Sequence, residues 1–381
     1  MKKILFVILI FLASYCFAIS EDEILLEQEE AFDLFENTQE KINPYSKQAL
    51  KAIIEKEYNL NSAEGIFKEQ LEYKFQKGII NDVGLSLKTR STFTESINDD
   101  SSHLLFRPNI IDLGIKGKFK GEKEAFNTLF ELAPEHENFF NKLVLDAWIE
   151  TTRIPNNVLL FGNSRTPTGL EGGMSAFLIP FATRSQTARN LGNARKTGLR
   201  LKGEYKYFDY DIGGYSSDTY LSEFMPGVEG NIWLQAKPFA NKKEKLGNLI
   251  VAAGYNTGVR NSKDFNVVST ALSYEHKKFW TRAEYQYANG SNGASGLSEK
   301  TRQGWNITAA YRLTKKLEIL ARYDEFDPNM NIKTLNQREY TAGINYYLLG
   351  QGLRFIFNYV FCQNQTPNPS HKIIFSTQIL L

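Results

Sequence analysis

Hydrophobic and polar residues alternate along most of the chain after residue 80. Near the C-terminus, Leu353, Phe355, Phe357, Tyr359 and Phe361 alternate with Arg354, Ile356, Asn358 and Val360. The same pattern recurs at residues 199–206, 305–313, 317–324 and 339–348. A period of two indicates β-strands that present one apolar and one polar face. Residues 81–381 are therefore expected to form an all-β domain.

A soluble sandwich also alternates, so three further features are needed to identify the class of sheet. The polar faces carry full charges, as a wet lumen requires, and many apolar faces end in Tyr, Phe or Trp, as a membrane interface requires. Short connections at 276–278, 314–316 and 349–352 alternate with long polar ones at 288–302, 325–338 and 362–370. Together these features predict a transmembrane antiparallel β-barrel.

The alternating segments predict about 16 strands. They are expected to begin near residues 82, 108, 124, 142, 156, 196, 208, 228, 246, 264, 278, 302, 316, 336, 352 and 371. A barrel of roughly this size leaves an aqueous channel along its axis. The last strand, residues 371–381, must pair with the first strand to remove both sheet edges.

The first 18 residues have the pattern of a secretory signal peptide. Lys2 and Lys3 precede an apolar run over residues 4–13, and Cys16-Phe17-Ala18 supplies a small-x-small cleavage site. We expect cleavage after Ala18 and export to the outer membrane of a bacterial cell. A lipoprotein attached through Cys16 is the weaker alternative, because Tyr15 stands where a small residue is expected. No later apolar stretch is long enough for a spanning helix, so a membrane protein of this sequence must be a closed barrel.

Charge divides the remaining chain into an acidic head and a basic body. Residues 19–80 hold 14 Asp and Glu against 7 Lys and Arg, whereas residues 81–381 hold 29 against 36. We interpret the head as a periplasmic extension of short helices over residues 21–39 and 45–76, with a coiled coil or a plug as the alternative. Removal of the leader leaves Cys362 as the only cysteine, so neither a disulfide nor a thiol metal site can form.

Residues 163–196 interrupt the strand pattern and are the candidate constriction loop. A segment of this length without strands inside a compact domain is usually functional or disordered. It holds five basic residues and one acid, and in a porin such a segment can fold into the lumen, where a basic ring attracts anions. The candidate anion-binding residues, including two on the strand that follows, are Arg165, Arg184, Arg189, Arg195, Lys196, Arg200 and Lys202.

Further basic residues fall on the polar faces of other predicted strands. These secondary lumen candidates are Lys116, Lys118, Lys120, Arg282, Arg312, Arg322 and Arg354. Both groups have an alternative role, because they can pair with wall carboxylates instead of facing solutes. The possible partners are Asp112, Asp146, Glu150, Glu204, Glu284, Glu318 and Asp324. The arginines of residues 163–196 can also lie on an exterior loop.

Four motifs make the chain similar to the phosphate-selective porin O and P family over roughly residues 80–381. They are Arg165-Thr-Pro-Thr-Gly-Leu-Glu171, Leu320-Ala-Arg-Tyr-Asp324, the pair Gly343-Ile-Asn-Tyr-Tyr-Leu348 and Leu353-Arg-Phe-Ile-Phe-Asn-Tyr-Val360, and Thr377-Gln-Ile-Leu-Leu381. The resemblance implies a 16-stranded homotrimer whose third loop folds inward, and anion preference, with phosphate selectivity, through basic residues at the constriction. Arg184, Arg189 and Arg195 fall in the corresponding loop. The chain departs from the family at Thr168, where Phe is common, and at Leu381, where an aromatic is common.

The sequence thus predicts a porin, a water-filled outer-membrane channel for passive diffusion of small hydrophilic solutes, with small anions such as phosphate preferred. A structural or plugged barrel without channel activity is the first alternative. A barrel hydrolase is the weaker one, because it needs a His beside carboxylates or a Ser, and only His103, His136, His276 and His371 are available. No Gly-rich phosphate loop, metal-ligand cluster or nucleic-acid motif appears. We therefore expect membrane lipid as a partner, and no cofactor, metal or nucleic acid.

Overall fold

The computed structural model describes residues 71–74, 78–98, 101–132, 143–218, 223–332, 336–363 and 369–381. The chain divides into two units, Met1–Lys56 and Glu57–Leu381, and every described residue belongs to the second. The expected signal peptide and the acidic extension up to residue 70 lie outside the described residues. Among the described residues, no helix is both long and apolar enough to cross a membrane.

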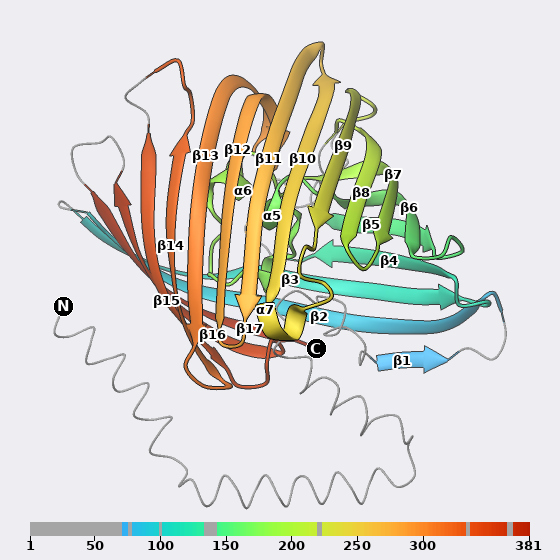
Figure 1. Ribbon diagram of the computed structural model, residues 1–381, viewed down its shortest axis with the longest axis horizontal. Coiled ribbons are helices and arrows are strands. Elements are labelled where there is room, and N and C mark those ends of the chain that lie inside the picture. The colour runs from blue at the N-terminus through green and yellow to red at the C-terminus, as the bar shows by residue number, and fades with distance from the viewer. Residues whose placement is uncertain are drawn as a thin grey trace, which may run out of the picture. The chain divides into compact units, whose positions relative to one another are not determined.

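Sixteen antiparallel strands, β2 to β17, close into a barrel in which each strand pairs with its neighbours in sequence (Figure 1). They are β2 (Ile80–Asn98), β3 (Ser101–Phe119), β4 (Glu124–Glu131), β5 (Val144–Thr151), β6 (Asn157–Arg165), β7 (Arg195–Glu204), β8 (Phe208–Ser216), β9 (Gly227–Ala236), β10 (Asn248–Arg260), β11 (Lys263–His276), β12 (Phe279–Gly293), β13 (Gly296–Arg312), β14 (Leu317–Asp327), β15 (Gln337–Tyr347), β16 (Leu353–Gln363) and β17 (Ser370–Leu380). The predicted fold class and strand number are confirmed.

The barrel closes where the last strand meets the first. β17 pairs with β2 from Leu380 opposite Lys88 to His371 opposite Ile97, as the strand that runs to the C-terminus predicts. β2 continues beyond the end of β17, and there a short strand, β1 (Leu71–Lys74), pairs with its residues 82–85. The helix expected over residues 45–76 is therefore wrong at 71–74. These residues instead form a strand that pairs with the part of β2 that β17 leaves uncovered.

The alternation of side chains between the two faces is confirmed in the strands. On β16, Phe357 and Tyr359 are exposed on the outer face, whereas Arg354 and Asn358 are completely buried on the inner face. The outer aromatic rings form a row across β13, β14, β15 and β16. Ring centroids are 4.8 Å apart from Trp305 to Tyr323, 5.0 Å from Tyr323 to Tyr340, and 6.0 Å from Tyr340 to Phe361. Such a row is typical of a membrane interface.

The long polar loop expected at residues 288–302 is wrong. β12 and β13 continue through this segment and are joined by a turn at residues 294–295, with a bulge between Asn289 and Ser291. Gly290 sits in the bulge at a φ of 69°, which favours glycine. The polar composition reflects buried contacts instead of a loop, since the Asn292 amide donates to the Ser217 carbonyl oxygen at 2.7 Å and to Glu229 Oε2 at 2.9 Å.

The barrel has two ends that differ in their connections. At one end, which we call the turn end, the strands are joined by residues 120–123, 152–156, 205–207, 237–247, 277–278, 313–316 and 348–352, and the longest of these holds α7 (Lys243–Leu246). The other end, the loop end, carries longer connections, although β10–β11 and β12–β13 are joined there by two residues each. Lys120 lies in the first turn and not on a strand with Lys116 and Lys118, which corrects its expected place on the lumen face.

Candidate functional site

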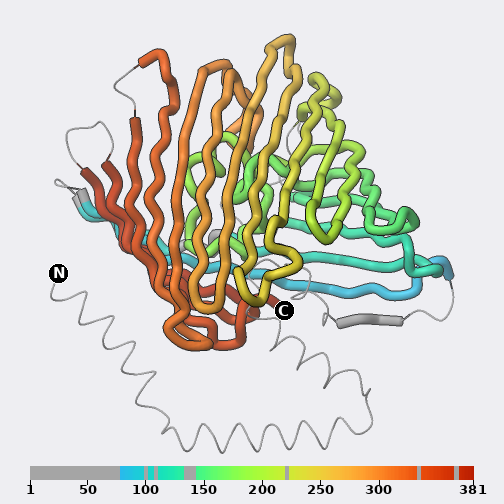
Figure 2. Tube along the Cα trace, viewed as in Figure 1, coloured from blue at the N-terminus to red at the C-terminus, as the bar shows by residue number. Residues whose placement is uncertain are grey.

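The β6–β7 connection, residues 166–194, folds into the barrel, and we call it the inward loop. It contains α5 (Leu170–Gly173), a 3-10 turn at Ala176–Leu178 and α6 (Gln186–Asn190). α6 packs against β12, β13 and β14, and Figures 1 and 2 show the green segment within the curve of the strands. The sequence prediction that residues 163–196 hold no continuous strand pattern is confirmed for this part.

Apolar side chains of the inward loop pack against one side of the barrel wall. Phe181 forms a buried cluster with three wall residues, Trp280, Ala310 and Leu320. Ala182 is buried in a second cluster, with Ile356, Val360, Cys362 and Ile374. Leu191 packs in a third, with Val267, Ala288 and Phe326. The loop therefore covers the inner face of the wall from β11 to β17.

Carboxylates and an amide of the same wall accept hydrogen bonds from backbone N–H groups of the loop. Glu284 on β12 accepts from the N–H of Leu170 at 2.8 Å and from that of Glu171 at 3.2 Å. Asp324 on β14 accepts from the N–H of Gln186 at 2.6 Å. Asn358 on β16 likewise accepts from the N–H of Ala182 at 2.8 Å. Because buried backbone groups need partners, these contacts fix the path of the loop.

Three buried arginines of the wall, which we call the arginine clamp, donate to carbonyl oxygens of the loop. Arg90 on β2 donates to Ala176 O at 2.7 Å, Arg354 on β16 to Ile179 O at 3.0 Å, and Arg322 on β14 to Thr183 O at 3.1 Å. Arg322 and Arg354 were expected to line the lumen as anion sites. They do face the barrel interior, but their guanidinium groups are engaged in holding the loop.

A cavity of about 510 Å³ lies on the opposite side of the inward loop, against the wall formed by β2 to β7. Seven basic side chains and three acidic ones line it. The basic ones are Lys88, Lys116, Arg165, Arg184, Arg195, Arg200 and Lys202, and the acidic ones are Asp112, Glu131 and Asp146. The formal excess of four positive charges makes this cavity the candidate functional site.

Several basic groups of this cavity are held in place by neighbours. Arg195 Nε donates to Asp146 Oδ1 at 2.8 Å, a pairing that the sequence analysis foresaw as an alternative role. Arg200 forms a two-pronged pair with Asp211, with Nε to Oδ1 at 2.6 Å. Arg184 donates to the carbonyl oxygens of Glu171 and Met174 within the loop. These contacts fix the orientation of the guanidinium groups and offset part of their charge.

Two of the seven primary candidates lie away from the cavity. Lys196 pairs with Glu229, and both side chains are only 1% exposed. Arg189 extends to the opposite wall, where its Nη2 atom lies 2.9 Å from Glu339 Oε2. The structure thus brings together Arg165, Arg184, Arg195, Arg200 and Lys202, and separates these two.

The remaining secondary candidates occupy different surroundings. Arg312 pairs with Glu275 at 3.0 Å and with Glu318 at 3.7 Å. Arg282 lies over the Trp280 ring, 4.9 Å from its centroid. Of the β3 lysines, Lys116 lines the cavity, whereas Lys118 and Lys120 are exposed and are absent from its lining.

Lys88 and Arg90 are interior residues that the sequence analysis did not single out. They lie on the inner face of β2 with Ser86 and Thr92, and all four are buried. Lys88 and Arg90 alternate with Leu87, Thr89 and Ser91, a pattern that places them on the inner face. The pattern is weak, because the outer positions of this strand are less apolar than those of later strands. Within the part of the chain that the structure describes, no group of three or more His, Cys, Asp or Glu could hold a metal ion.

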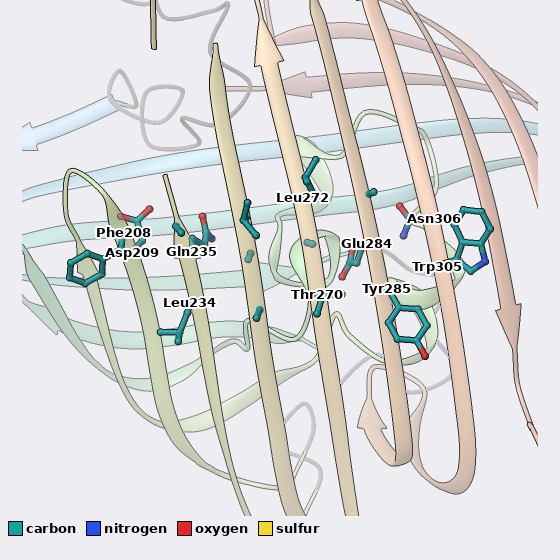
Figure 3. A pocket seen from close by; sticks show the side chains of 16 residues that line it. Phe208, Asp209, Leu234, Gln235, Thr270, Leu272, Glu284, Tyr285, Trp305 and Asn306 are labelled. Atoms are coloured by element: carbon teal, nitrogen blue, oxygen red, sulfur yellow. The ribbon is translucent and has the colours of Figure 1, made fainter. Parts of the chain in front are cut away.

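A second hollow, of about 660 Å³, lies across β8 to β13, and its exposed side chains belong to the outer face. Figure 3 shows Glu284 and Tyr285 leaving opposite sides of β12, and Trp305 and Asn306 leaving opposite sides of β13. Tyr285 and Trp305 are exposed, whereas Glu284 and Asn306 are buried toward the inward loop. The hollow therefore belongs to the apolar outer surface and is not part of the lumen.

Solved structures with a similar fold are outer-membrane proteins. The outer membrane channel DcaP of Acinetobacter baumannii aligns with a TM-score of 0.59 at 12% identity, over 81% of this chain and 99% of that one. An anion-selective porin from Comamonas acidovorans aligns with a TM-score of 0.59 at 11% identity, over 78% and 99%. The trimer form of OmpT, an outer membrane protein from Vibrio cholerae, aligns with a TM-score of 0.55 at 12% identity, over 78% and 98%.

Comparison of sequences assigns the C-terminal part of the barrel. No curated protein matches the chain. The family model described as phosphate-selective porin O and P matches residues 240–379, a stretch that contains the motifs at 320–324, 343–348 and 353–360 on which the resemblance was based. The chain is thus a closed 16-stranded barrel with the fold of outer-membrane porins, and its residues 240–379 match the phosphate-selective porin O and P family.

Proposed function

We propose that this chain forms a water-filled outer-membrane channel through which small hydrophilic solutes diffuse passively, with anions preferred. The observation that carries the proposal is the cavity beside the inward loop, where seven basic side chains face three acidic ones. The loop covers the wall from β11 to β17, so a solute that crosses the barrel passes along the wall from β2 to β7. An excess of fixed positive charge at a narrow point attracts anions and repels cations.

Phosphate is the anion that the family match suggests, because residues 240–379 match the phosphate-selective porin O and P family. The description of the Comamonas porin as anion-selective supports the same sign of preference. The site offers donors suited to a phosphate group, since arginine and lysine bind its oxygens through charge-assisted hydrogen bonds. The candidate binding residues are Arg165, Arg184, Arg195, Arg200 and Lys202, joined by Lys88 and Lys116.

The proposal places a homotrimer in the outer membrane after removal of residues 1–18. Support for the location comes from the porin fold and from the family match. Support for the trimer comes from the OmpT structure that is described as a trimer form. The exposed aromatic row on β13 to β16 fits a lipid interface around each barrel.

A plugged barrel is the second candidate, and the tight packing of the inward loop favours it. Phe177, Phe181 and Leu191 are each 1% exposed, so these side chains of the loop are as deeply buried as those of a protein core. A hydrolase has less support, because the His371 ring bonds the Tyr359 hydroxyl at 2.6 Å and both residues lie on the outer-face row of β16 and β17. We therefore propose a channel and not an enzyme.

Single-channel recording in a planar bilayer under a KCl gradient tests the proposal. We expect a stable conductance and a reversal potential displaced toward the chloride equilibrium potential, with phosphate reducing the chloride current. A displacement toward the potassium potential would keep the channel and remove the anion preference. Absence of current from folded, heat-modifiable protein would favour the plugged barrel.

A further inference from the structure

The turn end of the barrel is strongly basic. Its connections hold twelve basic residues, Lys120, Lys123, Arg153, Lys206, Lys237, Lys242, Lys243, Lys245, Lys277, Lys278, Lys315 and Lys316, against two acids, Glu122 and Glu244. At the loop end, setting the inward loop aside, the described residues of the connections hold Asp218 and Glu223 and no basic residue. Among the connecting residues that the structure describes, positive charge is therefore concentrated at the turn end.

Apolar side chains project from the same turns. Leu349 is 67% exposed, Tyr207 50%, Ile154 47% and Leu313 43%. Basic groups lie beside two of them: the Lys206 ammonium sits 5.5 Å from the centroid of the Tyr207 ring, and Arg153 directly precedes Ile154 in the chain. A mouth that only attracted dissolved ions would not need exposed apolar side chains in the same turns as its basic residues. Ammonium groups next to apolar side chains suit a phospholipid surface, where the apolar part enters the acyl boundary and the charge meets phosphate.

The predominance of lysine over arginine also favours a phospholipid surface as the partner. Eleven of the twelve are lysine, and most are exposed. Lysine is a flexible point charge that follows mobile headgroups, whereas arginine forms rigid two-pronged pairs with a fixed anion. The barrel interior shows the contrast, because there arginines make the fixed contacts of the clamp. The surface is thus built for many weak, exchanging phosphate contacts.

We propose that the turn end is a binding surface for anionic phospholipid headgroups of the adjoining membrane leaflet, and we call it the lysine surface. Each lysine near an anionic membrane surface contributes about fivefold to binding. The lysine surface would orient the barrel and set its depth in the leaflet that carries these lipids. This role does not depend on the anion preference of the channel.

Binding of fluorescent phosphatidylglycerol to the full chain, folded in neutral detergent and followed by anisotropy, tests the proposal. The variant Lys277→Gln/Lys278→Gln is expected to lower affinity for phosphatidylglycerol about 25-fold and to leave the weak binding of phosphatidylcholine unchanged. Lys263→Gln/Lys300→Gln, at the loop end, is the matched control and should have no effect. Lys277→Arg/Lys278→Arg should retain binding, which separates loss of charge from loss of fold.

Three results would overturn the proposal. They are unchanged affinity in the turn-end glutamine variant, an equal loss in the loop-end control, and displacement of the lipid by inorganic phosphate at the same concentration. The last result would assign the surface to free anions instead of lipid. Because Lys277 and Lys278 do not line the cavity, the reversal potential of the turn-end variant should equal that of the unaltered protein. Failure of the lipid test is therefore distinguishable from failure of the channel proposal.

Discussion

Arg354 is the residue whose replacement tests most sharply how the inward loop is held. Its side chain is fully buried on β16. Its Nη2 atom donates to the carbonyl oxygens of Ile179 at 3.0 Å and Phe177 at 3.4 Å, and to Oε1 of Gln378 at 2.9 Å. Arg354→Met keeps much of the length of the side chain and removes every donor. We predict that this change loosens the loop without preventing the barrel from closing.

The size of the effect follows from these contacts. A hydrogen bond from a charged donor contributes roughly 1.5–3 kcal/mol, and a buried carbonyl left without a donor costs about 1–3 kcal/mol. The 3.0 Å bond to Ile179 is the main loss, because the contact to Phe177 is long. Docking of the loop should weaken by about 3 kcal/mol, which raises the undocked fraction about 100-fold. The packing of Phe181 and Ala182 keeps most loops docked, so the change should appear as transient events.

Single-channel recording reads out such events as current noise. We expect Arg354→Met to show brief steps of altered conductance and a faster cleavage of the loop by added protease. Arg312→Met is the matched control, because this interior arginine pairs with Glu275 and Glu318 instead of the loop. If Arg354→Met has the conductance, noise and protease resistance of the unaltered protein, apolar packing alone holds the loop and the clamp has no such role.

The contacts support further predictions. Arg184→Glu, at the cavity, should shift the reversal potential toward cations, whereas Arg189→Glu, on the opposite side of the loop, should leave it unchanged; equal shifts would contradict the proposed path. Lys196→Met leaves the buried carboxylate of Glu229 without its counter-charge, so stability should fall by about 3–5 kcal/mol, seen as a lower temperature of heat modification on gels. Adding Glu229→Gln should recover part of that loss. Ile307→Arg places a charge on the outer face of β13. At the bilayer midplane such a charge lowers the stability of the folded barrel by about 2–4 kcal/mol, so we expect reduced folding into vesicles. Normal folding would argue against a lipid-facing position.

The number of strands, and the face on which each side chain lies, could be predicted from the sequence because side chains of a barrel wall alternate regularly between its two faces. Each strand has lipid on one side and the lumen on the other, so period-two alternation alone places β14 to β17. The prediction fails where polar residues in a strand make buried contacts and so resemble a loop in composition. Residues 288–302 look like a loop because they are rich in Gly, Asn and Ser, yet their polar groups are used in buried contacts of a hairpin.

The docking of the inward loop left a signal that the sequence analysis did not use. Trp280, Ile356 and Ile374 stand at inner positions where a wet lumen should have polar residues, and each is covered by the loop. Which arginines face the cavity could not be predicted, because residues 163–196 have no periodicity to fix side-chain direction. Arg184 donates to carbonyl oxygens of the loop itself, whereas Arg189 pairs with Glu339 across the barrel, and nothing in the sequence pattern distinguishes these two partners.

Modification of single introduced cysteines during channel recording tests the central claim, that solutes pass between the inward loop and the wall from β2 to β7. With Cys362 replaced by Ser, Ser175→Cys places a thiol on the cavity, and Ser376→Cys places one under the loop on the opposite wall. An anionic methanethiosulfonate reagent should reduce the current through the Ser175→Cys channel and leave the Ser376→Cys channel unaffected. Reduction at Ser376→Cys, with none at Ser175→Cys, would contradict the account.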